Sequence, residues 1–129
     1  MKYFDSIRLD LPFEQAVTRV REVLAEQGFG VLTEIDVRAT MKAKLGEDME
    51  DYVILGACNP PLAHQALQVD RSVGLLLPCN VVVRRADDVT VVEVLDPQVM
   101  VAVPERDDLG PVADEAGRRL SVALSALTG

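Results

Sequence analysis

The chain has no tryptophan, and only two tyrosines and three phenylalanines stand among its 129 residues. So few aromatic side chains argue against a platform on which the bases of single-stranded nucleic acid would stack. Basic residues are scarce as well, with 13 Lys and Arg against 21 Asp and Glu and a formal charge of −8. Phosphate groups are bound largely through Lys and Arg, so we expect neither a nucleic acid nor an anionic membrane as partner.

Long hydrophobic runs are also missing. No segment approaches the roughly 20 apolar residues that a membrane-spanning helix requires. The first residues, Met1 to Asp5, lack the apolar stretch of a secretory signal. We therefore expect a cytoplasmic protein. Thiols stay reduced in that compartment, so a structural disulfide between Cys58 and Cys79 is not presumed.

The length predicts one domain over residues 1–129, and the periodicity predicts its elements. Apolar residues at helical spacing follow Pro12, and Gly28 ends this first helix. Alternation or β-branched residues then predict strands. The expected elements are strands at 3–9, 29–37, 52–57, 81–83 and 90–95, and helices at 12–27, 38–45, 62–69 and 107–127. The order β-α-β(3–4)-α predicts an α+β fold, a mainly antiparallel sheet with helices packed on one face.

Two Cys-Asn dipeptides stand next to the ends of predicted strands, Cys58-Asn59 before Pro60 and Cys79-Asn80 after Pro78. Strand ends at the edge of a core are common places for a binding cleft. If the two strands are neighbours, both thiols approach the same cleft. A thiol with a lowered pKa could act there as a nucleophile, a redox centre or a ligand of a soft metal ion. The alternative is that both are small buried core residues. The spacing is not CxxC, so no metal site is predicted.

A second candidate set is polar. Glu34 and Asp36 alternate along one strand and share a face, where paired carboxylates can act as acid and base. Lys44 is placed to form an ion pair with one of them. The alternative is a solvated sheet face without chemistry. His64, the only histidine, follows Cys58 closely enough for a Cys–His pair, although an exposed histidine explains it equally.

Several fragments together resemble the bacterial and archaeal domain-of-unknown-function family number three hundred and two. They are Gly28-Phe29, Thr33 to Val37, Lys44-Leu45-Gly46, Leu55 to Pro60, Leu76 to Val81, and Asp96-Pro97 with Met100. The resemblance covers nearly the whole chain. It implies a fold like one half of the TATA-binding protein and a homodimer. It implies no established activity, substrate or cofactor, and fold alone does not carry function.

Three hypotheses about function follow. The first is a small-ligand-binding module with a cleft near Cys58, Asn59, Cys79 and Asn80, lined in part by the polar set. The second is a redox protein or enzyme that uses a reactive thiol. The third is a structural or interaction homodimer without catalysis. The sequence identifies neither a catalytic residue nor a cofactor, so whether the chain is an enzyme stays open.

Overall fold

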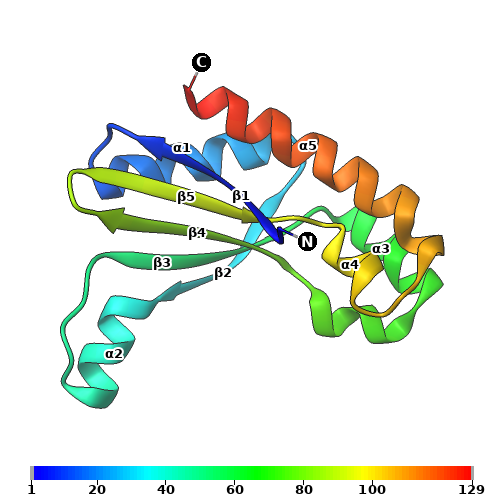
Figure 1. The fold of residues 1–129 in the computed structure, drawn as a ribbon, viewed down its shortest axis with the longest axis horizontal. Coiled ribbons are helices and arrows are strands. Elements are labelled where there is room, and N and C mark those ends of the chain that lie inside the picture. Colours follow the sequence, from blue (N-terminus) through cyan, green and yellow to red (C-terminus); the bar gives the residue numbers. More distant parts are fainter. Residues whose placement is uncertain (1, 129) are drawn as a thin grey trace.

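The computed structural model describes residues 2–128, and its centre is one antiparallel sheet (Figure 1). The strand order is β1-β5-β4-β3-β2, and every neighbouring pair is antiparallel. The strands are β1 (Phe4–Leu9), β2 (Gly30–Asp36), β3 (Tyr52–Cys58), β4 (Cys79–Ala86) and β5 (Val89–Leu95). The predicted antiparallel α+β fold is confirmed, with four strands after the first helix.

Two long helices, α1 (Phe13–Glu26) and α5 (Gly110–Thr128), cover one face of the sheet (Figure 1). Their apolar residues recur at helical spacing and pack on the inward side chains of the strands. Gly28, with φ of 83°, follows α1 in the left-handed conformation that glycine adopts without strain. The main core contains Val20, Leu24, Leu55, Val81, Val83, Val92 and Leu120.

The short helix α2 (Val37–Leu45) behaves differently, because it extends away from the sheet beyond β2 (Figure 1). Asp36 begins it by accepting a hydrogen bond from the backbone N–H of Ala39 at 2.9 Å. Gly46 ends it with φ of 68°. None of its residues is buried, so local capping accounts for α2 better than core packing does.

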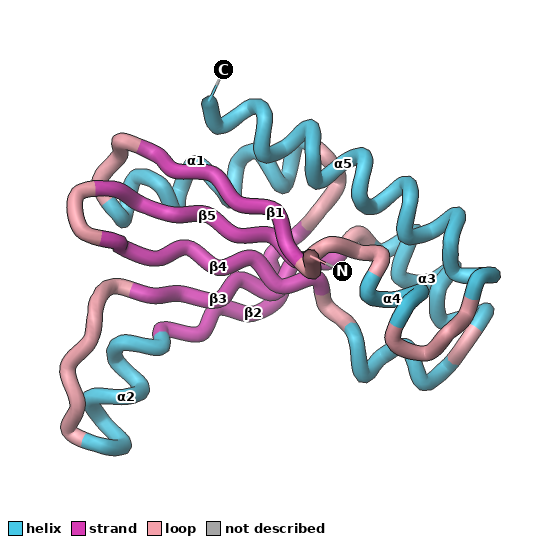
Figure 2. The backbone as a smooth tube through the Cα atoms, viewed as in Figure 1, coloured by secondary structure: helices cyan, strands magenta, loops and turns pink. Residues whose placement is uncertain are grey.

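At the opposite end of the sheet, the remaining helical segments gather into a separate layer (Figure 2). These are α3 (Pro60–Val69), η1 (Arg71–Leu76), α4 (Val99–Ala102) and η2 (Asp107–Leu109). Together with Val112 of α5 they form a second apolar cluster that contains Ala66, Val73, Met100 and Leu109. No helix within residues 2–128 is long and apolar enough to cross a membrane.

Two local expectations are wrong. The hairpin turn predicted at 84–88 is shorter, because β4 continues to Ala86. Arg84 stays in the strand by pairing with Glu93 across the sheet, 2.7 Å from Nε to Oε1. The predicted alternation of 29–37 is also broken. A bulge between Val31 and Thr33 shifts the register, so Val31 and Thr33, which were expected to share a face, lie on opposite faces of the sheet.

The second face of the sheet carries apolar side chains in its middle. Register places Ile35, Ile54 and Val82 next to one another on the side away from α1 and α5. Ile35 is exposed, whereas Ile54 and Val82 are half-buried. Leu95 of β5 and Phe4 of β1 are opposite one another in register and lie on this same side. A solvated face of an antiparallel sheet is usually polar, so this open face, as we call it, differs from that expectation.

Candidate functional site

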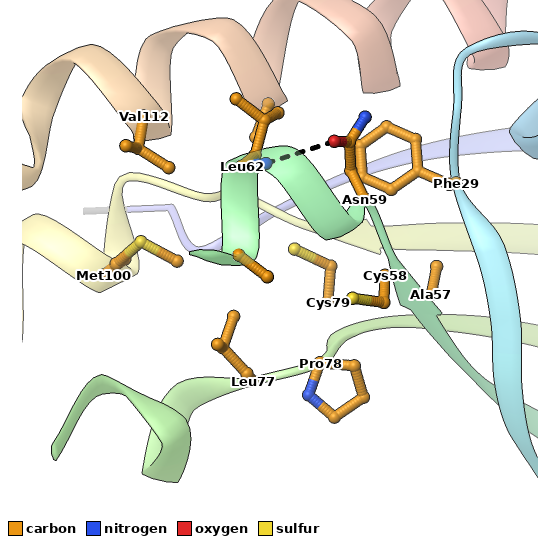
Figure 3. Close-up of a pocket in the computed structure, with 12 residues that line it drawn as sticks. Phe29, Ala57, Cys58, Asn59, Leu62, Leu77, Pro78, Cys79, Met100 and Val112 are labelled. Atoms are coloured by element: carbon orange, nitrogen blue, oxygen red, sulfur yellow. Dashed lines mark hydrogen bonds between the residues drawn. The ribbon is translucent and has the colours of Figure 1, made fainter. Parts of the chain in front are cut away.

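The two Cys-Asn dipeptides come together at one end of the sheet. Cys58 ends β3 and Cys79 begins β4, and these strands are neighbours with Ala57 opposite Cys79. Both cysteines line one cavity of about 30 Å³ under α3 (Figure 3). The neighbouring strands thus bring both cysteines to the wall of one small cavity, whereas a ligand-binding role for them stays a prediction. Both are free thiols.

Asn59 is part of the structural frame of this cavity. Its side chain is buried, with 6% exposure, and Oδ1 accepts a hydrogen bond from the backbone N–H of Leu62 at 3.2 Å. This bond caps α3, whose first residues are the prolines that suit a helix start. The sequence reading began this helix at Leu62, two residues late, because the cap was not recognised. The oxygen of Asn59 is thereby already occupied.

Asn80 has the opposite environment. It is exposed on the second residue of β4, on the open face. It lines two hollows at once. One lies between the segment before β4 and the end of β5, with a volume of about 200 Å³. The other lies on the open face beside Tyr3, Phe4 and Tyr52, with a volume of about 240 Å³.

These hollows adjoin one another around Cys79 and Leu95. Cys79 lines both the thiol cavity and the 200 Å³ hollow, whereas Leu95 and Asn80 line that hollow and the one on the open face. Apolar side chains form most of the surface, including Leu77, Met100 and Val82. The arrangement offers an apolar crevice with the Asn80 amide as a polar group along its course.

The chemistry of the two thiols is unequal. Burial, and to a smaller extent the neighbouring Cys58, raises the pKa of the Cys79 thiol to about 11. An apolar surrounding disfavours the thiolate, which is the reactive form. Cys58 is half-buried. His64 does not serve either thiol, because it is exposed and its Nε2 lies 3.2 Å from the amide nitrogen of Gln68.

The predicted polar set lies elsewhere. Glu34 pairs with Arg21 of α1 at 2.8 Å, and Asp36 caps α2. Both carboxylates line a groove of about 290 Å³ between α1 and the edge of the sheet, which none of the Cys-Asn residues lines. Lys44 makes no ion pair with Glu34 or Asp36 in the described part of the chain, because it stands at the far end of α2. The structure thus separates this set from the thiols.

Sequence reasoning missed residues that the fold brings to the thiols from far along the chain. Met100 of α4 and Val112 of α5 both line the cavity, and Leu77 closes it from the segment before β4. Met100 did stand in one of the family-like fragments, beside Asp96-Pro97. No spacing in the sequence, however, connects Met100 with two cysteines that precede it by 21 and 42 residues.

Comparison with known proteins gives a family and a closely similar fold. The family model described as "Domain of unknown function DUF302" matches residues 6–127. A solved structure described as an uncharacterised conserved DUF302 protein from Bacillus stearothermophilus is 28% identical, with a TM-score of 0.90. The match covers 97% of this chain and 98% of that chain. A search of curated proteins finds no match. The chain therefore belongs to the DUF302 family of domains of unknown function.

Proposed function

We propose that the chain is a small-ligand-binding module whose ligand lies in the apolar crevice around Cys79, Asn80 and Leu95. The observation that supports it is the continuity of the hollows, which share these lining residues from the thiol cavity to the open face. Pockets for drug-sized molecules usually enclose about 300 to 1,000 Å³. The separate hollows are smaller, so the ligand is small or slender, with an apolar body and one group that hydrogen-bonds to the Asn80 amide.

Binding fits this geometry better than thiol catalysis. A nucleophilic thiol requires a lowered pKa or an adjacent base. Cys79 has a raised pKa, and His64 faces Gln68 rather than a thiol. Both cysteines are free, which agrees with the reducing cytoplasm that we propose as its location. The acidic composition supports the proposal that nucleic acid is not the partner.

Titration with N-phenyl-1-naphthylamine, an uncharged apolar probe that fluoresces in apolar surroundings, tests the crevice. Asn80→Phe fills the junction of the two larger hollows, so we expect at least about tenfold weaker probe binding. The matched control is Leu45→Phe, because Leu45 is exposed on α2, far from the crevice. Equal affinity in both variants, or no binding by the unmodified chain, would refute the site.

A homodimer is the second candidate, and the apolar open face favours it. Ile35 is exposed on that face beside the half-buried Ile54 and Val82, and exposed apolar patches often mark an interaction surface. We propose that a second copy covers them. Sedimentation velocity at micromolar concentration measures the state. We expect Ile54→Lys to give a monomer and Val122→Lys, at an exposed position of α5, to leave the dimer intact. A monomeric unmodified chain would exclude this arrangement.

A further inference from the structure

Three of the five aromatic side chains in the sequence line one hollow on the open face. These are Tyr3, Phe4 and Tyr52, and the hollow, which we call the aromatic hollow, has a volume of about 240 Å³. Phe4 belongs to β1 and Tyr52 to β3, with β5 and β4 between them in the sheet. The chain has few aromatic residues, so their concentration here indicates a surface suited to one kind of ligand.

Aromatic rings of this kind attract cations. The face of a ring carries partial negative charge, so an ammonium group binds over it. The chain itself shows such a contact at Phe4, where the Nζ atom of Lys2 lies 5.4 Å from the ring centroid. The rings of Tyr3 and Phe4 also meet edge to face, with their centroids 5.0 Å apart. Two of the three rings are therefore held against one another beside the hollow.

A carboxylate in the wall of the aromatic hollow adds a full negative charge. Glu93 of β5 lines it, and its side chain is 23% exposed. Oε1 of Glu93 accepts a hydrogen bond from Nε of Arg84 at 2.7 Å, whereas no hydrogen bond to Oε2 is found within residues 2–128. Arg84 is not among the residues that line the hollow. One carboxylate oxygen is thus available to a ligand, and a partly buried charge is screened less than an exposed one.

From this combination we infer that the aromatic hollow binds the head group of an organic cation, a quaternary or methylated ammonium. Aromatic faces recognise such groups through cation–π attraction. A hard metal ion requires several oxygen ligands, and the hollow offers one carboxylate and the amide of Asn80. An anion is repelled by Glu93. The inference rests on the proposed function, because it names the chemical class of the ligand and the part of the crevice that holds its charged group.

The position of the aromatic hollow in the crevice orients the rest of the ligand. Asn80 and Leu95 line this hollow and also the adjoining one of about 200 Å³. A ligand whose ammonium group lies at the rings and Glu93 therefore extends past the Asn80 amide. That amide hydrogen-bonds to a hydroxyl or carbonyl group of the ligand, and the apolar body contacts Leu95.

Choline and 3,3-dimethyl-1-butanol test the inference, because the two molecules have the same shape and only choline is charged. A titration followed by ¹H–¹⁵N NMR measures both affinities, and the amides that shift locate the bound molecule. We expect choline to bind at least about tenfold more tightly than the alcohol. Phe4→Leu removes one ring and lowers the affinity for choline at least about threefold, whereas Phe4→Tyr keeps the ring and the affinity.

Glu93→Gln tests the carboxylate at nearly constant size. We expect it to lower the affinity for choline at least about fivefold and to leave the affinity for the alcohol unchanged, since only choline interacts with the charge. The matched control is Glu47→Gln, which changes the net charge equally at an exposed position after α2. This control keeps the affinity for choline.

Two results would overturn the inference. One is equal affinity for choline and the alcohol, and the other is choline binding that both Glu93→Gln and Phe4→Leu leave unchanged. Failure of the proposed function gives a different pattern, because N-phenyl-1-naphthylamine then fails to bind as well. Binding of that uncharged probe without binding of choline means that the crevice takes a neutral ligand and that the ammonium site is wrong.

Discussion

The same dipeptide, Cys-Asn, occurs at the end of β3 and at the start of β4, yet its residues exchange environments. In the first, Cys58 is half-buried and Asn59 is buried as the cap of α3. In the second, Cys79 is buried with 8% exposure and Asn80 is exposed. Strand alternation explains Cys79 and Asn80, because adjacent residues in a strand face opposite sides. Asn59 has already left the strand for a helix start. Position in the fold, not the dipeptide, decides what each residue does.

The largest difference we expect between the two motifs is in thiol reactivity. With a pKa of about 11, Cys79 is a thiolate in about one molecule in ten thousand at pH 7. Burial also hinders its access to reagent. We expect iodoacetamide to modify Cys58 at least about a hundredfold faster than Cys79 in the folded protein. Peptide mapping by mass spectrometry after timed quenching measures both rates.

Protein unfolded in urea is the control for this comparison. There the two thiols lose their separate environments, and their labelling rates converge. Equal rates in the folded protein, or faster labelling of Cys79, would show that the start of β4 opens to solvent in solution. That result would favour the hypothesis of an enzyme with a reactive thiol over the hypothesis of a ligand-binding module.

The sequence predicts the elements of this fold well, for physical reasons that are visible in α1 and α2. The apolar positions of α1, such as Val20 and Leu24, repeat at helical spacing and are the ones that become buried. Gly28 was expected to end its helix, and both it and Gly46, which follows the helix expected at 38–45, have positive φ. Such signals are local, since spacing and capping act within a few residues.

The candidate site depends on information that is not local. The bulge at Leu32 follows from pairing with β3, so alternation within 29–37 does not reveal it. Lys44 was expected near Glu34, but α2 carries it away from the sheet and Arg21 of α1 takes that place. Met100 reaches the thiols only after the whole sheet has formed. Sequence reasoning brought Cys58 and Cys79 together because neighbouring strands join them.

The second prediction concerns stability in alkaline solution. In the folded protein the pKa of Cys79 is raised from 9.0 to about 11, so between these pH values the unfolded chain has lost a proton that the folded chain keeps. Unfolding is therefore favoured as pH rises through that window. Two pH units correspond to roughly 2 to 3 kcal/mol of unfolding free energy. Urea denaturation at pH 9 and pH 11 measures the loss.

Cys79→Val separates this effect from the other groups that titrate in the same range. The variant keeps a side chain of similar size but has no thiol to ionise, so its stability declines less over the window. Parallel curves for the variant and the unmodified chain would mean that Cys79 titrates alike in both states, and its burial would not be maintained in solution.

A smaller effect is expected at the first asparagine. Asn59→Ala removes the side-chain acceptor for the Leu62 N–H and leaves that donor without a partner at the buried start of α3. Loss of an N-cap costs about 0.5 to 2 kcal/mol. We expect about 1 to 2 kcal/mol because Asn59 is buried. Chemical denaturation measures the change, and Asn59→Asp, which restores an acceptor, recovers part of it. A loss of less than about 0.5 kcal/mol, which is what we expect for a substitution at an exposed position, would contradict the role of Asn59 as a cap.

The smallest effect is expected at the second asparagine, and it completes the comparison. Asn80 is exposed, and its side chain takes part in none of the hydrogen bonds found within residues 2–128. Surface substitutions of this kind change stability by less than about 0.5 kcal/mol. We therefore expect Asn80→Ala to have the same free energy of unfolding as the unmodified chain. The variant binds less tightly any ligand that hydrogen-bonds to the amide. A large loss of stability would mean that Asn80 contacts a second copy of the chain, since a side chain facing only solvent has nothing to lose. Repeating the denaturation at two protein concentrations distinguishes these cases, because only an interface makes the loss depend on concentration.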